Sequence, residues 1–236
     1  MQRYSVITEK NPREIVLLRG RGCRYRQCAF CDYHEDASTD EEENLLLNRE
    51  ALGQVTGVYG ILEVVNSGSF CELDESTMRE IAYTCRQKNI RTIHFECHWL
   101  YRRFIPALRK RFGDDGIEVK VKIGVETFDA VYRENVMHKG IMETSPRKIA
   151  EGYDECCLLF GLPGQTEDSM LADIRTGLQF FSRVCVNMMV ENSAPLKPDG
   201  EVRRIFMDKV YPLFRDNDRV DILLNNTDFG VGETDR

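Results

Sequence analysis

The 236-residue chain lacks a long hydrophobic run and lacks an excess of positive charge. No apolar stretch approaches the ~20 residues that a membrane-spanning helix needs, so we expect no membrane segment. Lys and Arg number 32 against 39 Asp and Glu, which gives a formal net charge of −7. Surfaces that hold nucleic-acid phosphates are normally basic, so this balance argues against DNA or RNA as a partner. It suits a small neutral or cationic substrate instead.

The chain also lacks internal repeats, low-complexity segments and a convincing linker. Its length is ordinary for one α/β barrel-like unit, and its hydrophobic content of 42% is enough for one core. We therefore expect residues 1–236 to form a single domain.

Cysteine, in contrast, is present in a distinctive cluster. Three of the nine cysteines lie within nine positions near the N-terminus. Cys23, Cys28 and Cys31 belong to a segment that we call the cysteine loop, residues 22–31. Three closely spaced thiols can hold three irons of a cubane cluster and leave the fourth iron open to a substrate or cofactor. The loop is therefore the most informative feature of the sequence.

Other uses of these thiols remain open. Zinc prefers four ligands, so a zinc site would need a distant fourth ligand such as Cys97 or His98. Disulfides fit poorly, because the cysteine count is odd, we find no signal peptide, and a chain of this size does not need them for stability. Reduced thiols and an iron–sulfur loop indicate the cytoplasm.

Strand-like and helix-like segments alternate along the chain, which favours a parallel sheet with crossover helices. We expect strands near residues 14–18, 61–66, 91–97, 118–126, 156–161, 184–191 and 219–225. We expect helices near residues 45–57, 74–88, 101–112, 145–154, 167–182 and 201–215.

Two of the expected strands, at residues 92–98 and 119–126, alternate between apolar and polar residues. Residues two apart share a face of a strand, so the polar sets should point to the barrel interior. These sets are Thr92, His94, Glu96 and His98 in the first strand, and Lys120, Lys122, Gly124 and Glu126 in the second. A closed barrel is filled by branched apolar side chains, so a polar interior indicates an opened barrel with a ligand cavity. An antiparallel sheet with one face in water is the alternative, which the intervening helices disfavour.

The cysteine loop resembles that of the radical S-adenosylmethionine (SAM) enzymes, whose usual pattern is Cys-x3-Cys-x2-Cys with an aromatic residue before the last cysteine. Phe30 fills the aromatic place, and the first gap is four residues, as in some branches of the superfamily. The resemblance implies an α/β fold, a partial (βα)6 TIM-like barrel. It also implies a 4Fe–4S cluster on Cys23, Cys28 and Cys31, with SAM on the open iron. One electron, from a donor such as flavodoxin or ferredoxin, then cleaves SAM to methionine and a 5′-deoxyadenosyl radical.

Two further motifs resemble SAM-binding segments of the superfamily. Ser67-Gly68-Ser69 occupies the place of the glycine-containing motif that holds the methionine amino group. By the same resemblance Glu126, in Gly-Val-Glu-Thr, reaches the ribose hydroxyls or the amino group. A plain strand-to-helix turn and an exposed strand-end carboxylate are the alternatives.

The run Gly-Leu-Pro-Gly-Gln-Thr at residues 161–166 resembles a segment of the coproporphyrinogen-dehydrogenase and elongator-like branches. Its backbone borders the adenine of SAM in such enzymes, which implies that Leu162 and Pro163 contact the cofactor. Thr166 can cap the helix that follows.

Residues that act on the substrate should lie at the carboxyl ends of the strands. Our catalytic candidates are His94, Glu96 and Glu191, and our substrate-binding candidates are Asn192, Asn226 and Asp228. A carboxylate beside amides can read a purine-like base through its N–H groups. Each candidate also has an ordinary interpretation, as a core histidine or as turn residues.

The acidic charge and the absence of additional domains favour a small molecule over tRNA. Within the superfamily the chain is similar to lyases that cleave the side chain of queuine, a 7-deazaguanine base, and release 7-aminomethyl-7-deazaguanine. A radical SAM enzyme that modifies another tRNA base or small molecule is the alternative within this class. An iron–sulfur sensor or electron-transfer protein is the alternative from another class, and it would need a fourth cluster ligand and no adenosine pocket.

Overall fold

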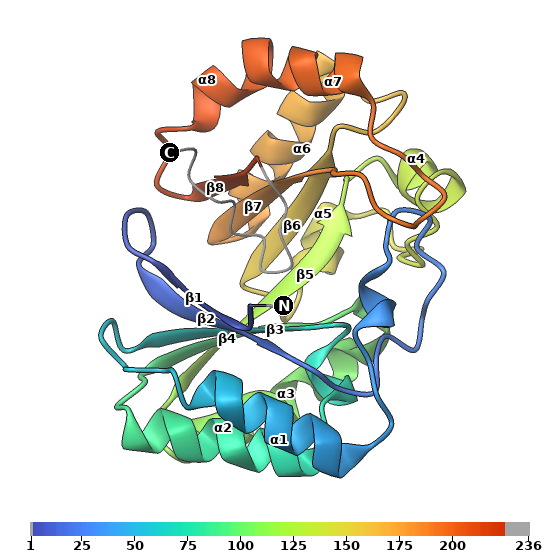
Figure 1. Cartoon of the computed structure of the whole chain (residues 1–236). Coiled ribbons are helices and arrows are strands. Elements are labelled where there is room, and N and C mark those ends of the chain that lie inside the picture. Colours follow the sequence, from blue (N-terminus) through green and yellow to red (C-terminus); the bar gives the residue numbers. More distant parts are fainter. Residues whose placement is uncertain (1, 225–236) are drawn as a thin grey trace. The chain divides into compact units, whose positions relative to one another are not determined.

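The computed structural model describes residues 2–224. Among these, residues 2–24 and 33–122 form one compact unit, and residues 25–32 and 123–224 form another. We call them the first unit and the second unit (Figure 1). Strands β1 to β8 are neighbours in chain order in one sheet, and β5 (Glu118–Glu126) contributes residues to both units.

The first unit is a sheet with helices on one face (Figure 1). β1 runs antiparallel to β2, whereas β2, β3, β4 and the start of β5 run parallel. Its other strands are β1 (Tyr4–Ile7), β2 (Arg13–Leu18), β3 (Ile61–Asn66) and β4 (Thr92–Glu96). Its helices are η1 (Tyr33–Glu35), α1 (Glu41–Leu52), η2 (Phe70–Glu72), α2 (Glu75–Gln87), η3 (Trp99–Phe104) and α3 (Ile105–Gly113).

The two faces of this sheet differ in polarity, as the alternating pattern predicts. Val64, Phe95 and Val121 are paired across β3, β4 and β5 and are buried. The Phe95 ring lies 5.4 Å from the ring of Phe112 in α3, so this face packs against the helices. The opposite face carries Glu63, His94, Lys120 and Lys122, which confirms the predicted polar face. His98 is not part of it, because β4 ends at Glu96 and His98 caps η3 instead.

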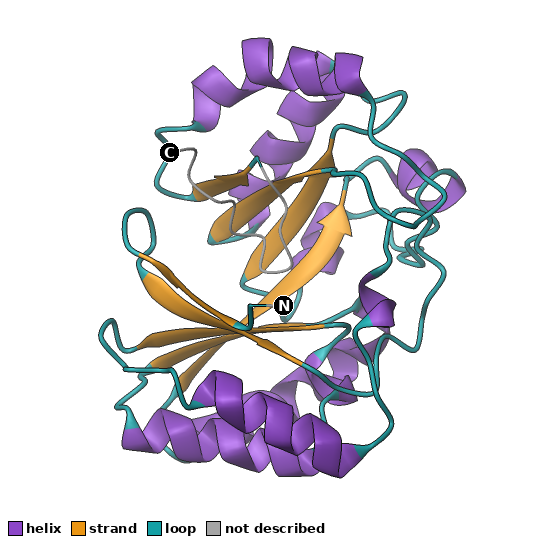
Figure 2. Ribbon diagram, in the orientation of Figure 1, coloured by secondary structure: helices purple, strands orange, loops and turns teal. Residues whose placement is uncertain are grey.

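The second unit repeats the arrangement with three further parallel strands, and α6 packs against β6 and β7 (Figure 2). The strands are β6 (Glu155–Phe160), β7 (Arg183–Met188) and β8 (Val220–Leu223). The helical segments are α4 (Ala130–Asn135), α5 (Pro146–Ala150), α6 (Glu167–Phe180), α7 (Gly200–Ile205), the π-helical η4 (Phe206–Val210) and α8 (Tyr211–Phe214). No helix among residues 2–224 has the length and apolar character that crossing a membrane requires.

The predicted strands are confirmed within a few residues, but two predicted helices are broken. The helix expected at 201–215 passes through a π-helical turn, and Pro212 follows in α8. The helix expected at 101–112 begins as 3-10 helix, and Pro106 lies in the first turn of α3. Proline has no N–H for the i→i−4 bond, so it favours a helix start over a helix interior. Strand β1 and helix α4 were not predicted.

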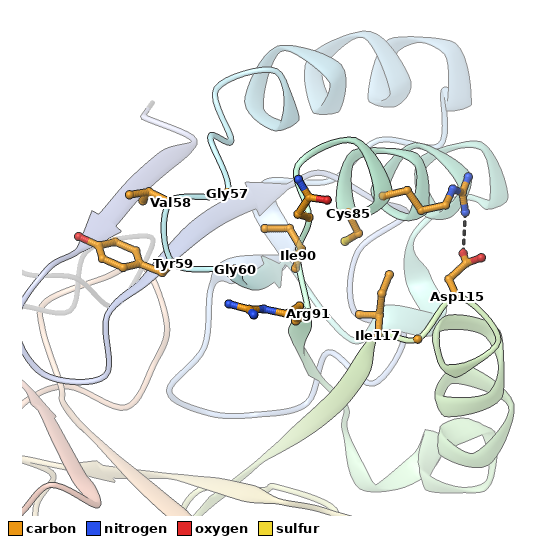
Figure 3. A pocket seen from close by; sticks show the side chains of 12 residues that line it. Gly57, Val58, Tyr59, Gly60, Cys85, Ile90, Arg91, Asp115 and Ile117 are labelled. Carbon is orange, nitrogen blue, oxygen red and sulfur yellow. Dashed lines mark hydrogen bonds and ion pairs between the residues drawn. The ribbon is translucent and has the colours of Figure 1, made fainter.

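A cavity of about 650 Å³ lies at the amino ends of β3, β4 and β5 (Figure 3). Arg86 and Asp115 on its wall form an ion pair at 2.6 Å, and burial raises the pKa of the Cys85 thiol to about 12. The backbone N–H groups of Gly60, Ile90 and Arg91 are already bonded within the loops. These groups on the cavity wall are thus engaged in structural contacts, and the cavity lies at the end of β3 opposite to Asn66.

Candidate active site

The side chains of the three cysteines of the loop are half-buried. Cys23 belongs to the first unit, whereas Cys28 and Cys31 belong to the second. In number and type, three thiolates match the donor set that a cubane cluster with one open iron requires.

In the first unit the carboxylate of Glu72 fixes the backbone beside Cys23. It accepts hydrogen bonds from the Arg24 amide at 2.5 Å, the Ser69 amide at 2.7 Å and the Tyr101 hydroxyl at 2.9 Å. Glu72 is only 6% exposed, and its role was missed by our sequence analysis. A capping-box pattern, Ser69 followed by Glu three residues later, is the signal that could have found it.

Gly68 is required by close packing in the same turn. A Cβ atom at this position would collide with the Glu72 carboxylate and would lie 3.2 Å from the Cys23 Cα. The predicted motif at residues 67–69 therefore contacts the start of the cysteine loop directly.

The two serines of that motif are engaged in structural hydrogen bonds. The Ser67 hydroxyl donates to the Asp36 carbonyl, and the Ser69 hydroxyl accepts from the His98 amide at 2.8 Å. Asn66, next to them, is 3% exposed, and its Oδ1 is a buried acceptor without a hydrogen-bond partner among the described residues. Such an atom is uncommon in proteins and fits an N–H donor of a ligand, such as the amino group of SAM.

In the second unit, Glu126 lies at the end of β5 in an unusual backbone conformation. Its φ is +66°, which non-glycine residues rarely adopt, and it is 7% exposed. Its carboxylate accepts from the Lys139 ammonium at 2.7 Å. A Cβ on Gly124 would lie 2.5 Å from Glu126 Oε1, so the glycine leaves room for this side chain. Strain of this kind is concentrated at functional sites.

The Gly161–Thr166 segment is a tight, satisfied turn. Gln165 accepts from the Leu162 amide at 3.0 Å and donates to the Leu159 carbonyl at 2.8 Å. Leu162 is fully buried in an apolar cluster with Phe30, Met137, Leu159 and Met189. Thr166 caps α6, as the sequence predicted.

The candidates for catalysis and substrate binding lie in different surroundings. Glu96 is partly exposed and lies 3.8 Å from the Lys122 ammonium, on the face that also holds the buried His94.

The remaining candidates lie in the loop after β7 and in the C-terminal tail. Glu191 is a surface side chain paired with Lys197 at 2.9 Å. Asn192 donates to the Phe30 carbonyl at 2.8 Å and so supports the cysteine loop. Asn226 and Asp228 lie outside the described residues.

Known structures give a close match over the whole chain. A queuine lyase from Clostridium spiroforme bound to SAM and queuine aligns with a TM-score of 0.92 and 42% sequence identity, covering 99% of this chain and 100% of that chain. SuiB of Streptococcus suis bound to SAM aligns with a TM-score of 0.55 at 12% identity, over 88% of this chain and 49% of its own. A second SuiB structure gives 0.52 at 12% identity, over 87% and 48%. No family model and no curated protein matches the chain.

These likenesses settle the fold and the family. At 12% identity SuiB supports the fold alone, whereas 42% identity over the full length of both chains is evidence of family membership. The predicted α/β fold, a partial (βα)6 TIM-like barrel of the radical SAM type, is confirmed. The chain is therefore an enzyme that belongs to the radical SAM superfamily and, within it, to the family of the queuine lyase.

Proposed function

We propose that this enzyme is a queuine lyase, which splits the side chain from the 7-deazaguanine base and releases 7-aminomethyl-7-deazaguanine. The observation that supports it most strongly is the full-length likeness, at 42% identity, to an enzyme whose structure holds SAM and queuine. We further propose that residues 1–236 act as one radical SAM core domain on a small molecule in the cytoplasm, where thiols stay reduced.

The cofactors in this proposal are SAM and a 4Fe–4S cluster on Cys23, Cys28 and Cys31. When bound, they supply the one-electron cleavage that starts the radical chemistry, and a flavodoxin or ferredoxin supplies the electron. The chain's own contribution is to orient the ligands: Glu72 holds the backbone after Cys23, and the buried ring of Phe30 anchors the stretch between Cys28 and Cys31.

We assign the SAM contacts to buried polar groups and to turn backbone. The amino group of SAM is assigned to the Asn66 amide oxygen and to the backbone of Ser67, Gly68 and Ser69. The two serine hydroxyls are already engaged in hydrogen bonds within the protein. Glu126 accepts from the ribose or the amine, and Leu162 and Pro163 border the adenine.

For queuine we assign roles by charge and position. Glu96, beside Lys122 on a buried polar face, and His94 on the same face suit the side-chain diol and the secondary ammonium. Glu191 and Asn192 belong to the loop after β7 and remain candidates, and Asn226 and Asp228 are assigned to the guanine-like edge of the base.

The direct test is turnover under anaerobic conditions. Cluster-loaded enzyme, dithionite, SAM and queuine should give 7-aminomethyl-7-deazaguanine together with 5′-deoxyadenosine, measured by mass spectrometry. Cys28→Ala should lose the cluster and both products, whereas Cys85→Ala, a buried thiol far from the loop in sequence, should keep them. If queuine neither binds nor stimulates 5′-deoxyadenosine formation in enzyme that holds about four irons per chain, the substrate assignment is wrong.

A further inference from the structure

Lys139 is a buried charged residue that the sequence analysis did not single out. It is 8% exposed, and its ammonium donates to Glu126 at 2.7 Å. The same ammonium lies 5.4 Å from the centroid of the Phe30 ring, within the range of a cation–π contact. It therefore lies beside the cysteine loop, within the second unit.

The backbone around Lys139 is tied to the cysteine loop by several contacts. The Ala29 amide donates to the Met137 carbonyl at 3.0 Å, and the Tyr25 hydroxyl donates to the His138 carbonyl at 2.8 Å. Gly140 has a φ of +72°, and a Cβ there would lie 2.5 Å from the Tyr25 ring and hydroxyl. The segment and the loop are thus packed too closely for any side chain at Gly140.

The backbone around Lys139 is also held by two residues of helix α4. Arg133, fully buried, donates to the carbonyls of Thr127 at 3.0 Å and Ile141 at 2.9 Å. Glu134 accepts from the amides of Gly140 at 2.8 Å and Ile141 at 3.0 Å. The position of Lys139 is therefore set by the fold and does not depend on a flexible surface loop.

Negative charge on neighbouring side chains favours the cationic form of Lys139. Burial alone would lower its pKa, but the interactions with Glu126 and with the side chains of Cys28 and Cys31 raise it. The contact with the Phe30 ring places this charge beside the stretch between Cys28 and Cys31, two of the three proposed cluster ligands.

We propose that Lys139 is a positioning residue whose buried positive charge raises the reduction potential of the cluster and whose ion pair holds the Glu126 carboxylate in place. This rests on the proposed function, since it requires the cluster. Reduction adds one electron from a donor such as dithionite and makes the cluster and its thiolates more negative, with no bond formed or broken. A fixed cation in a poorly solvated site stabilises the reduced state more than the oxidised state.

The test is an EPR-monitored redox titration of the cluster-loaded protein without SAM. Lys139→Met should lower the ratio of reduced to oxidised cluster about tenfold at a fixed potential, which is a shift of about 59 mV for a one-electron couple. Lys139→Arg should restore most of the wild-type potential, because it restores the charge. Lys148→Met, an exposed lysine of α5, should leave the potential unchanged.

A second variant keeps the inference testable if Lys139→Met fails to retain the cluster. Glu126→Gln removes the neighbouring negative charge, so it should raise the potential, in the opposite direction to Lys139→Met. An unchanged or lowered potential in Glu126→Gln, or a wild-type potential in Lys139→Met at full iron content, would overturn the inference while the proposed function stands. Failure of the wild-type protein to take up a four-iron cluster would overturn both.

Discussion

Each unit holds a buried ion triad contributed by three of its strands, and the two triads have opposite net charge. In the first unit the Glu63 carboxylate lies between Arg13 and Lys122, all 3–4% exposed. In the second unit the Arg183 guanidinium lies between Glu155 at 2.7 Å and Asp221 at 2.9 Å. One triad has a surplus cation and the other a surplus anion.

The triads also differ in where they lie along the strands. Glu155 and Arg183 are the first residues of β6 and β7, at the amino ends, where barrel residues serve stability. The first triad starts at Arg13, the first residue of β2, but extends through Lys122 to Glu96 at the carboxyl end of β4. We call the second triad closed, because its three charged side chains are buried, and the first triad open, because it leads to a partly exposed carboxylate that we assign to the substrate.

The largest expected effect comes from breaking the closed triad. Arg183→Met leaves two buried carboxylates without their cation, which should cost about 3–5 kcal/mol of the free energy of unfolding. Denaturant unfolding of the cluster-free protein measures it. Arg175→Met, an exposed arginine of α6, is the matched control and should change stability by less than about 0.5 kcal/mol. Equal losses in the two variants would contradict a structural role for the triad.

A second effect concerns a buried carboxylate of the second unit and depends on pH. Burial raises the pKa of Asp173 in α6 to about 6, so this carboxyl group is protonated up to a higher pH in the folded state than in the unfolded state. Stability should therefore fall as pH rises from about 4 to 6, by up to about 3 kcal/mol. Asp173→Asn should remove most of this slope in unfolding experiments at several pH values. A slope that persists in the variant would assign it to other groups.

Breaking the open triad should cost less. In Glu63→Gln the two cations lose their shared carboxylate, but Glu96 lies 3.8 Å from Lys122 and offsets part of the charge. We expect a loss of about 1–3 kcal/mol in the free energy of unfolding. We also expect weaker queuine binding, because Lys122 would be drawn toward Glu96. A loss in stability as large as that of Arg183→Met would remove the distinction between the triads.

The smallest effect concerns a hydrogen-bonded carboxylate of the first unit. Burial opposes ionisation of Glu14, but hydrogen bonds from the Thr56 amide, the Tyr4 hydroxyl and the Gly57 amide together lower its pKa. Stability from these bonds is present above the unfolded pKa and is lost as pH falls through the folded pKa.

Tyr4→Phe removes one of these bonds, at 2.7 Å, and should cost about 1 kcal/mol at pH 7. The difference from wild type should vanish in acid, once Glu14 is protonated. Tyr83→Phe, an exposed tyrosine of α2, should show no difference at either pH. A Tyr4→Phe deficit that is independent of pH would indicate lost packing in place of the lost hydrogen bond.

The sequence by itself determined the features that depend on local spacing. Three thiols within nine residues, the alternation in β4 and β5, and the Thr166 cap are each encoded in a short segment, so the strands and the cap could be predicted. The proposed cluster ligands and Glu126 were accessible in the same way, through motifs that resemble a known family.

The tertiary structure alone decided which distant residues meet. Glu72 reaches Arg24 across 48 positions, Lys139 pairs with Glu126 across 13 and lies over Phe30, and Glu63 joins Lys122 across 59. Single charged residues carry no periodic signal, and their partners are fixed only when strands and turns from separate segments pack together. The same packing placed Glu191 in a surface ion pair and gave Asn192 a supporting bond, because the loop after β7 folds over the cysteine loop within the second unit.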